Sequence, residues 1–343
     1  MSVRRERVDL GDRSYDVVIG DGALQELGSL LPANASRAVV VTQQHLPVSV
    51  QPILENHGLK VVTVEIGDGE EHKSLASIEK IMRVCAAHSM TRGDVIVGVG
   101  GGMVTDVAGY AAASWHRGIA VVHVSTTLVG MVDAAIGGKT GVNIPEGKNL
   151  VGAFWQPSGV VCDTSTLATL PERERRCGYG EMAKYHFLTG DNLLAMDLAS
   201  RIARCVRIKA DIVSRDEREG GLRAVLNYGH TLGHALEIAT HFSLAHGEAV
   251  AVGLKFAALL ARSLGRIDDS RVAYHDAVIS QEYGLSTAMP GGLVASELVE
   301  LMKRDKKSSG GLTFMLDGAR GIEMVRDVPE NNVLDCLKLM EVR

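Results

Sequence analysis

The stretch Asp94-Val95-Ile96-Val97-Gly98-Val99-Gly100-Gly101-Gly102-Met103-Val104-Thr105-Asp106 indicates the fold class of the first half of the chain. A β-branched run typical of a buried strand leads directly into three glycines, after which we expect a helix to begin. Glycines let the backbone approach a pyrophosphate closely, and a helix N-terminus supplies free N–H donors. The GxGxxG spacing is absent, however, so a tight strand-to-helix turn is the alternative interpretation of this loop taken alone.

Strands of the same type recur on both sides of this stretch, and helical segments separate them. This alternation predicts a mostly parallel sheet with crossover helices, as in an α/β Rossmann-like dinucleotide-binding domain. Asp106 and the pair Thr126-Thr127 follow two of these strands at their carboxyl ends, where open α/β sheets bind ligands. The other expected strands cover residues 15–19, 37–42, 60–66, 119–124 and 159–163, and helices are expected at 22–31, 47–58 and 74–88.

The pattern changes after about residue 163, where strand-like runs become scarce. We expect an all-α C-terminal domain, apart from a possible strand pair at 312–316 and 321–325. The predicted domains are 1–165, an α/β nucleotide-binding domain, and 166–343, an α-helical domain that binds metal and substrate. The expected helices of the second domain cover 191–217, 222–240, 246–265, 269–283 and 294–304.

Composition limits the classes of function. The chain has 343 residues and a formal net charge of −5, so non-specific nucleic-acid binding is not expected. Charged residues interrupt every apolar window, and the N-terminus lacks the apolar core of a signal peptide, so we expect neither membrane insertion nor secretion. Five scattered cysteines without zinc-ligand spacing favour reduced thiols in a cytoplasmic protein.

Three histidines suggest a metal site. His230 and His234 are four residues apart and would share one helix face, while His246 lies between glycine and alanine at a probable helix start. Together with Glu181, His230 and His246 would offer zinc two imidazoles and one carboxylate, and would leave room for substrate oxygens. The alternative is that the helical histidines only satisfy core hydrogen bonds. The glycines before each of them favour the metal site.

Several basic residues have no evident role on the surface. Lys139 follows two glycines inside an apolar stretch, Lys184 lies three residues after Glu181, and Arg223 and Asn227 are one turn apart. Lysine and arginine gathered near a metal suit a substrate that carries phosphate and carboxylate groups.

Taken together, these motifs closely resemble the 3-dehydroquinate synthase family, one of the sugar-phosphate cyclases. The resemblance covers most of the chain and is strongest over 98–184 and 223–253. The motifs that carry it are Gly100-Gly101-Gly102-x-x-x-Asp106, Arg117-Gly118, Asp133, Gly137-Gly138-Lys139-Thr140, Gly147-Lys148-Asn149, Glu181-x-x-Lys184, Asn227-x-Gly229-His230-x-x-Gly233-His234, His246-Gly247-Glu248 and Asp305-Lys306-Lys307.

The resemblance implies a role for each group of residues. Zinc, or cobalt in its place, would be bound by Glu181, His230 and His246. NAD would be contacted by Glu70, Lys73, Gly100, Gly101, Gly102, Asp106, Thr126, Thr127, Lys139 and Lys148. The substrate phosphate would be surrounded by Lys139, Asn149, His234, Lys306 and Arg117, with Arg117 supplied by the neighbouring subunit of a homodimer. The carboxylate end would be held by Lys209, Arg223 and Asn227, and Asp133, Lys184 and Glu219 also match substrate-site positions.

The implied reaction converts 3-deoxy-D-arabino-heptulosonate 7-phosphate to 3-dehydroquinate and phosphate, a step of the shikimate pathway. It proceeds through transient oxidation by NAD, elimination of phosphate, re-reduction and aldol cyclisation. One departure from the family concerns the cofactor, because Gln43 stands where an acidic residue usually contacts the adenosine ribose.

Three alternatives remain open at this point. Another cyclase would act on sedoheptulose 7-phosphate or glucose 6-phosphate, which offer no carboxylate to Lys209, Arg223 and Asn227. A metal-dependent NAD alcohol dehydrogenase would need fewer phosphate-binding residues. A catalytically inactive binding protein would not require the complete set of polar residues.

Overall fold

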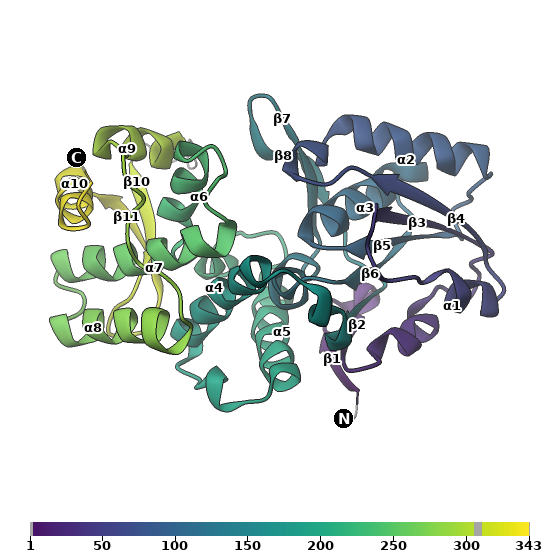
Figure 1. Ribbon diagram of the computed structural model, residues 1–343, viewed down its shortest axis with the longest axis horizontal. Coiled ribbons are helices and arrows are strands. Elements are labelled where there is room, and N and C mark those ends of the chain that lie inside the picture. Colours follow the sequence, from purple (N-terminus) through teal and green to yellow (C-terminus); the bar gives the residue numbers. More distant parts are fainter. Residues whose placement is uncertain (1–2, 305–310, 343) are drawn as a thin grey trace. The chain divides into compact units, whose positions relative to one another are not determined.

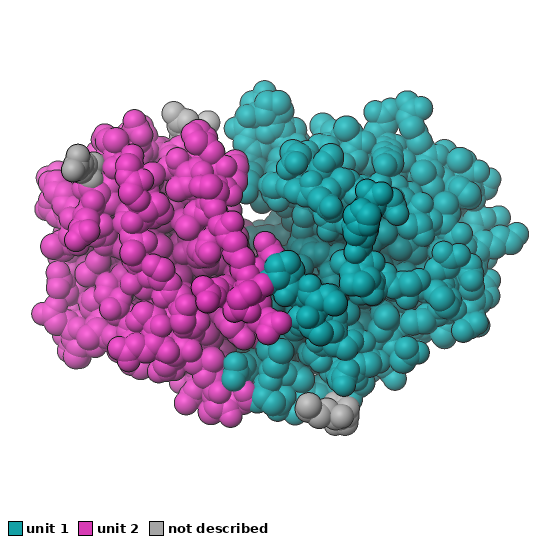
Figure 2. Space-filling model, in the orientation of Figure 1, with its two compact units in different colours: residues 1–171, 197–218 teal, residues 172–196, 219–343 magenta. Residues whose placement is uncertain are grey.

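The computed structural model describes residues 3–304 and 311–342 and divides the chain into two compact units. The first unit comprises Met1–Pro171 and Asp197–Arg218, and the second comprises Glu172–Met196 and Glu219–Arg343 (Figure 2). Lys306 and Lys307 lie outside the described residues, so the expected substrate contact of Lys306 has no structural counterpart here.

A seven-stranded sheet forms the centre of the first unit, in the order β1-β2-β9-β6-β5-β3-β4 (Figure 1). All neighbouring strands are parallel except β1, which pairs antiparallel with β2 and was not expected from the sequence. The Rossmann-like α/β architecture is confirmed. The strands are β1 Arg4–Val8, β2 Tyr15–Gly20, β3 Arg37–Gln43, β4 Lys60–Ile66, β5 Val95–Gly100, β6 Ala120–Ser125 and β9 Gly159–Asp163.

Both faces of this sheet are buried, because alternate residues of the central strands enter separate apolar cores. Val39 and Ile96 pack on one face beneath α2, Leu75–Ala87, and α3, Gly102–Ser114. Val40 and Val97 pack on the other, beneath α1, Gln51–Asn56, and a 3-10 helix at Ala23–Leu30. A separate hairpin of β7, Lys139–Ile144, and β8, Gly147–Phe154, was not expected, because its glycines and polar residues obscure the alternation of a strand.

The expected domain boundary needs one correction. Helix α5, Leu198–Arg215, was assigned to the second domain, but it belongs to the first unit. Its buried face includes Ile202, Val206 and Val213, and the helix packs against β1 and β2. Hydrophobic periodicity reveals that a helix has an apolar face, but not which sheet or helix that face will cover.

The second unit is helical except for the antiparallel pair β10, Leu312–Leu316, and β11, Glu323–Val328, which confirms the possible strand pair. The helix expected over 222–240 is instead a 3-10 turn at Leu222–Asn227 followed by α6, because Gly229 adopts φ 80°. No helix in the described part of the chain is both long and apolar enough to cross a membrane. The helices are α4 Glu172–Thr189, α6 His230–Ala239, α7 His246–Ser263, α8 Asp269–Ala277, α9 Ala295–Arg304 and α10 Glu330–Leu339.

Candidate functional site

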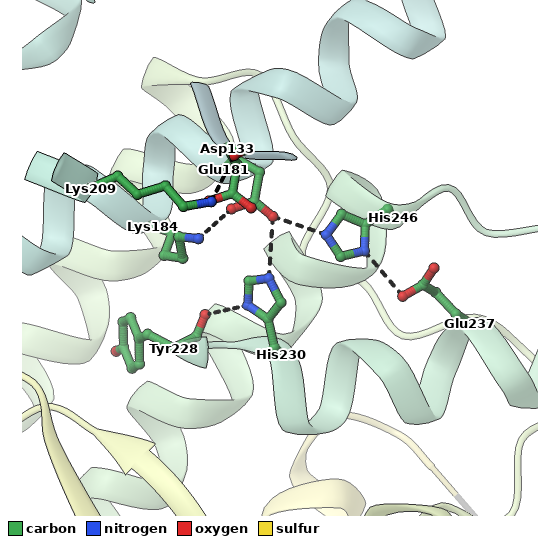
Figure 3. A network of polar contacts seen from close by, with 8 residues as sticks. All are labelled: Asp133, Glu181, Lys184, Lys209, Tyr228, His230, Glu237 and His246. Atoms are coloured by element: carbon green, nitrogen blue, oxygen red, sulfur yellow. Dashed lines mark hydrogen bonds and ion pairs between the residues drawn. The ribbon is translucent and has the colours of Figure 1, made fainter. Parts of the chain in front are cut away.

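Three side chains from three helices of the second unit meet at one point (Figure 3). Glu181 lies in the middle of α4, His230 begins α6 and His246 begins α7. Glu181 Oε1 is 3.2 Å from His230 Nε2 and 2.9 Å from His246 Nε2. One ligand atom from each residue lies within 4.8 Å of the other two, so the sequence expectation that these residues form one cluster agrees with the geometry.

Glycines in the second unit make this meeting possible. A Cβ on Gly180 would stand 2.4 Å from the carbonyl oxygen of Gly247, so α4 and the first turn of α7 can approach closely only without side chains there. Gly229, whose φ is 80°, turns the chain just before His230 and directs α6 from this point. The glycines in the motifs around Glu181, His230 and His246 therefore contribute through the close packing of the helices.

The tautomers of both histidines are set by partners on the far side of each ring. His230 Nδ1 lies 3.0 Å from the carbonyl oxygen of Tyr228, to which it donates, and His246 Nδ1 lies 3.1 Å from Glu237 Oε2. Each Nε2 therefore points toward Glu181 and is the atom that would bind a metal once it carries no proton. Glu237 was not expected at the site, although its position three residues after His234 places it on the same helix face.

The charges in this cluster shift the pKa values of its members. Burial would raise the pKa of Glu181, but Lys184, His230 and His246 outweigh burial and hold that pKa well below its ordinary value. Burial would lower the pKa of His246, yet its contacts with Glu181 and Glu237 raise it to about 10. Burial dominates at His230 and lowers its pKa, against the opposing effect of Glu181.

The donor set of this cluster fits a divalent metal such as zinc. Two imidazoles and one carboxylate are ligands typical of catalytic zinc, and they leave positions for substrate oxygens. Lys184 is fully buried, with Nζ 2.6 Å from Glu181 Oε2. His234 is half-buried, and its ring centre is 5.4 Å from that of His230 and 6.1 Å from that of His246.

A second polar group of the same unit lies in and before the 3-10 turn at Leu222–Asn227. Arg223 is buried, and Asn227 Nδ2 donates to Glu219 Oε1 at 2.9 Å. Glu219 has φ 60°, a conformation that costs energy for a residue with a side chain. The expected substrate residues Glu219 and Asn227 are therefore brought together.

The glycine-rich loop of the first unit has the geometry of an anion site. Strand β5 ends at Gly100, helix α3 begins at Gly102, and Gly101 provides no side-chain cap for the first N–H groups of that helix. A Cβ on Gly101 would stand 2.9 Å from Thr127 Cγ2. Backbone donors at a helix N-terminus, with no side chain over them, fit the pyrophosphate of a dinucleotide.

Lys73 contacts two other expected site residues of the first unit. Its Nζ lies 2.5 Å from Asp106 Oδ2 and 2.6 Å from Asn149 Oδ1. Burial raises the pKa of Asp106, and Lys73 only partly opposes this effect. Asn149, expected beside the substrate phosphate, thus contacts Lys73, which was expected to bind the cofactor.

The remaining expected residues of the first unit take several positions. Lys209 on α5 is buried and donates to the carbonyl oxygen of Asp133 at 2.7 Å and to Asp133 Oδ1 at 3.0 Å. Lys148 Nζ is 3.8 Å from Glu70 Oε1. Lys139 is exposed at the start of β7, and its apolar sequence neighbours had suggested otherwise. Arg117 is exposed and has φ 67°.

Comparisons with known proteins match both units. Family models described as 3-dehydroquinate synthase N-terminal and 3-dehydroquinate synthase C-terminal match residues 63–177 and 178–308. A protein of Amycolatopsis mediterranei (strain S699) with the provisional name aminodehydroquinate synthase is 49% identical over 334 residues, covering 97% of this chain and 93% of that protein. A 3-dehydroquinate synthase of a Picosynechococcus species is 40% identical and covers 94% of each chain.

Among solved structures, a 2-deoxy-scyllo-inosose synthase complexed with carbaglucose-6-phosphate, NAD+ and Co2+ superimposes with a TM-score of 0.88. The two sequences are 26% identical, and the alignment covers 98% of this chain and 99% of the other.

Proposed function

Because the chain belongs to the 3-dehydroquinate synthase family, we propose that it converts 3-deoxy-D-arabino-heptulosonate 7-phosphate to 3-dehydroquinate and phosphate, with NAD and a divalent metal. The observation that carries this proposal is the buried group of Glu181, His230 and His246 with Lys184 beside it. The group provides a carboxylate and two oriented imidazoles as metal ligands, and it places a lysine beside them where a substrate oxygen would bind.

The two cofactors supply complementary chemistry when bound, since NAD accepts and returns a hydride and the metal lowers the pKa of the hydroxyl that is oxidised. In the second unit, Glu181, His230 and His246 hold the metal. In the first, Gly100, Gly101 and Gly102 offer backbone donors to the pyrophosphate of NAD, together with Glu70, Lys73, Asp106, Thr126, Thr127, Lys139 and Lys148.

The residues proposed to bind the substrate fall into groups according to the substrate group that each would contact. Arg223 offers a planar fork of donors to the substrate carboxylate, and Asn227 is held by Glu219 next to it. Lys209, fixed by Asp133, adds a second cation for that carboxylate. Lys139, Asn149, His234 and Arg117 are proposed for the phosphate. Lys184 stabilises negative charge that develops on the oxygen under oxidation.

A second candidate is the amino counterpart of this reaction. The relative named for aminodehydroquinate is 49% identical, whereas the Picosynechococcus 3-dehydroquinate synthase is 40% identical. Replacing one substrate hydroxyl by an amine leaves the phosphate and carboxylate unchanged, so the residues proposed for those groups serve both substrates. The cyclases of sedoheptulose 7-phosphate and glucose 6-phosphate are less favoured, because their substrates have no carboxylate for Arg223 and Lys209 to bind.

Two further points are part of the proposal. A homodimer would supply Arg117, which is exposed on its own unit, to the neighbouring subunit. All five cysteines are buried and none forms a disulfide, which supports a location in the reducing cytoplasm.

The test is an assay of purified protein with the heptulosonate phosphate, NAD and zinc, which follows phosphate, dehydroquinate and NADH together. We expect equal amounts of phosphate and dehydroquinate with no net NADH. A parallel assay uses the amino analogue, and a much larger kcat/KM for it would select the second candidate. Lasting NADH formation on a simple alcohol would favour a dehydrogenase and contradict both.

A further inference from the structure

Tyr228 lies in the turn that leads into the metal cluster. Its φ of −59° and ψ of 125°, followed by φ 80° and ψ −16° at Gly229, are the dihedral angles of a type II turn. Asn227 stands before these two residues and His230 stands after them. One short turn therefore carries a residue proposed for the substrate carboxylate and a residue proposed for the metal.

The hydroxyl of Tyr228 contacts a histidine of α8. Tyr228 Oη lies 2.8 Å from His275 Nε2, and both side chains are fully buried. His275 Nδ1 lies 2.8 Å from the carbonyl oxygen of Arg271, which can only accept, so Nδ1 carries a proton. Burial lowers the pKa of His275 to about 4, so the ring is neutral near pH 7. Nε2 is therefore the acceptor and the hydroxyl of Tyr228 is the donor.

Two further contacts hold the ring of His275 in place. Phe187 on α4 stacks on it, with ring centres 4.0 Å apart and planes inclined by 10°. Arg271 Nε donates to Asp317 Oδ2 at 2.7 Å, and that carboxylate oxygen is 3.8 Å from His275 Nε2. His275 is thus enclosed by α4, α8 and the residue that follows β10, and it gives the hydroxyl of Tyr228 a fixed partner.

The backbone of Tyr228 in turn orients a metal ligand. Its carbonyl oxygen accepts from His230 Nδ1 at 3.0 Å, so the position of this oxygen sets the direction of His230 Nε2 (Figure 3). Gly229 is packed tightly against α7, because a Cβ on Gly253 would stand 1.9 Å from the carbonyl oxygen of Gly229. The turn is therefore held by backbone packing at Gly229 and by a side-chain hydrogen bond at Tyr228.

We propose that Tyr228 and His275 are a positioning pair, in which the hydrogen bond between their side chains fixes the carbonyl oxygen that orients His230 for metal binding. Neither side chain is among those proposed to contact the metal or the substrate, so the pair acts through His230. The inference rests on the proposed function only in requiring that Glu181, His230 and His246 bind a metal.

The test measures metal binding by the purified full-length protein and requires no turnover. Bound metal is removed with a chelator, and Co2+ is then titrated while the visible absorption spectrum, which depends on the ligand geometry of this ion, is recorded. The variants are Tyr228→Phe, His275→Leu, His275→Gln and the double variant Tyr228→Phe with His275→Leu. Tyr274→Phe is the matched control, because Tyr274 Oη also lies 2.6 Å from a histidine, at Nε2 of His186, but α8 carries none of the proposed metal ligands.

Tyr228→Phe should lower the affinity for Co2+ about tenfold, the size expected for a residue that orients a metal ligand, and should change the spectrum of the bound ion. His275→Leu should have the same effect. The double variant should bind no more weakly than either single variant, because each of these changes removes the same hydrogen bond. His275→Gln, whose amide oxygen can accept from Tyr228, should retain most of the wild-type affinity, and Tyr274→Phe should match the wild type.

Thermal unfolding of the metal-free proteins separates positioning from a purely structural role. A lower melting temperature in Tyr228→Phe with wild-type Co2+ affinity and spectrum would overturn the inference and leave the metal site in place. Losses of affinity that multiply in the double variant would also overturn it, because the two residues would then act separately. If the wild-type protein binds no Co2+, the inference and the proposed metal site both fail.

Discussion

Asp106 in the first unit and Glu181 in the second are both carboxylates beside a lysine, yet their pKa values shift in opposite directions. Burial raises the pKa of Asp106 despite the opposing charge of Lys73. The same effect of burial at Glu181 is outweighed by Lys184, His230 and His246, so its pKa falls well below the ordinary value. A buried carboxylate stays charged only where several donors surround it, and that is the property required of a metal ligand.

This difference separates the tasks of the two units. The second unit holds a preformed cluster of charged side chains that suits a metal and the reacting oxygen. The first unit supplies mainly backbone donors at the glycine-rich loop, and its ionised side chains largely compensate one another, as Lys73 does with Asp106 and Lys209 does with Asp133. Substitutions in the two units should therefore affect different measurements.

The largest effect is expected from Glu181→Gln, which keeps the shape of the side chain but removes its charge. Turnover should fall by about 10³-fold or more, because the metal contributes several kcal/mol to transition-state stabilisation. Metal content, measured by mass spectrometry, should fall with it, while NADH affinity stays near that of the wild type. His241→Asn, at an exposed histidine of the same unit, is the control, and full metal content in Glu181→Gln would contradict the assignment.

Lys73→Met tests the other half of the comparison. Loss of the lysine leaves Asp106 and Asn149 without their shared donor, so NADH affinity should fall about tenfold. Metal content should not change. Lys60→Met, at an exposed lysine at the start of β4, is the matched control. If Lys73→Met loses metal and retains NADH, the division of tasks between the units is wrong.

The pH dependence of metal binding should also be specific to the second unit. In the metal-free protein the pKa of His246 is about 10, above its ordinary value of 6.5, so its protonation stabilises the fold fully below about pH 6.5 and this contribution is lost as pH rises through about 10. A metal must displace that proton from Nε2. The apparent affinity should therefore rise about tenfold per pH unit between roughly pH 7 and 10.

Calorimetry in buffers of different ionisation enthalpy should detect the release of about one proton per metal bound at pH 8. Glu237→Gln removes one of the two carboxylates that raise this pKa, so its proton release at pH 8 should be smaller. Equal proton release in both proteins would show that Glu237 does not set the protonation of His246.

The smallest effects are expected at two glycines, one in each unit. Gly229→Ala should lower the free energy of unfolding by about 1–3 kcal/mol, because its φ is 80° and a Cβ would lie 2.9 Å from Leu254 Cδ2. Gly101 has an ordinary φ of −79°. Gly101→Ala should therefore lower the free energy of unfolding less than Gly229→Ala does, but it should weaken NADH binding. Denaturant titration and NADH titration of both variants measure the contrast.

Much of the architecture could be predicted from the sequence. Strand 159–163 and the strand ending in the glycine-rich loop follow from runs of β-branched residues between turn residues, and such local patterns fix local conformation. The spacing of His230 and His234 on one helix face is equally local. The hairpin at β7 and β8, the break at Gly229 and the placement of α5 were not foreseen, because each depends on packing against distant residues.

The sequence alone identified the residue types of the metal cluster. Its motifs also predicted that Glu181 would lie with His230 and His246. Only the tertiary structure decided that Glu237 orients His246, that Asn149 pairs with Lys73, and that Asp68 stands beside Gln43. The physical reason is that hydrophobic periodicity and glycine positions act along a few turns of chain, whereas charge and hydrogen bonding depend on distances of about 3 Å between segments far apart in sequence.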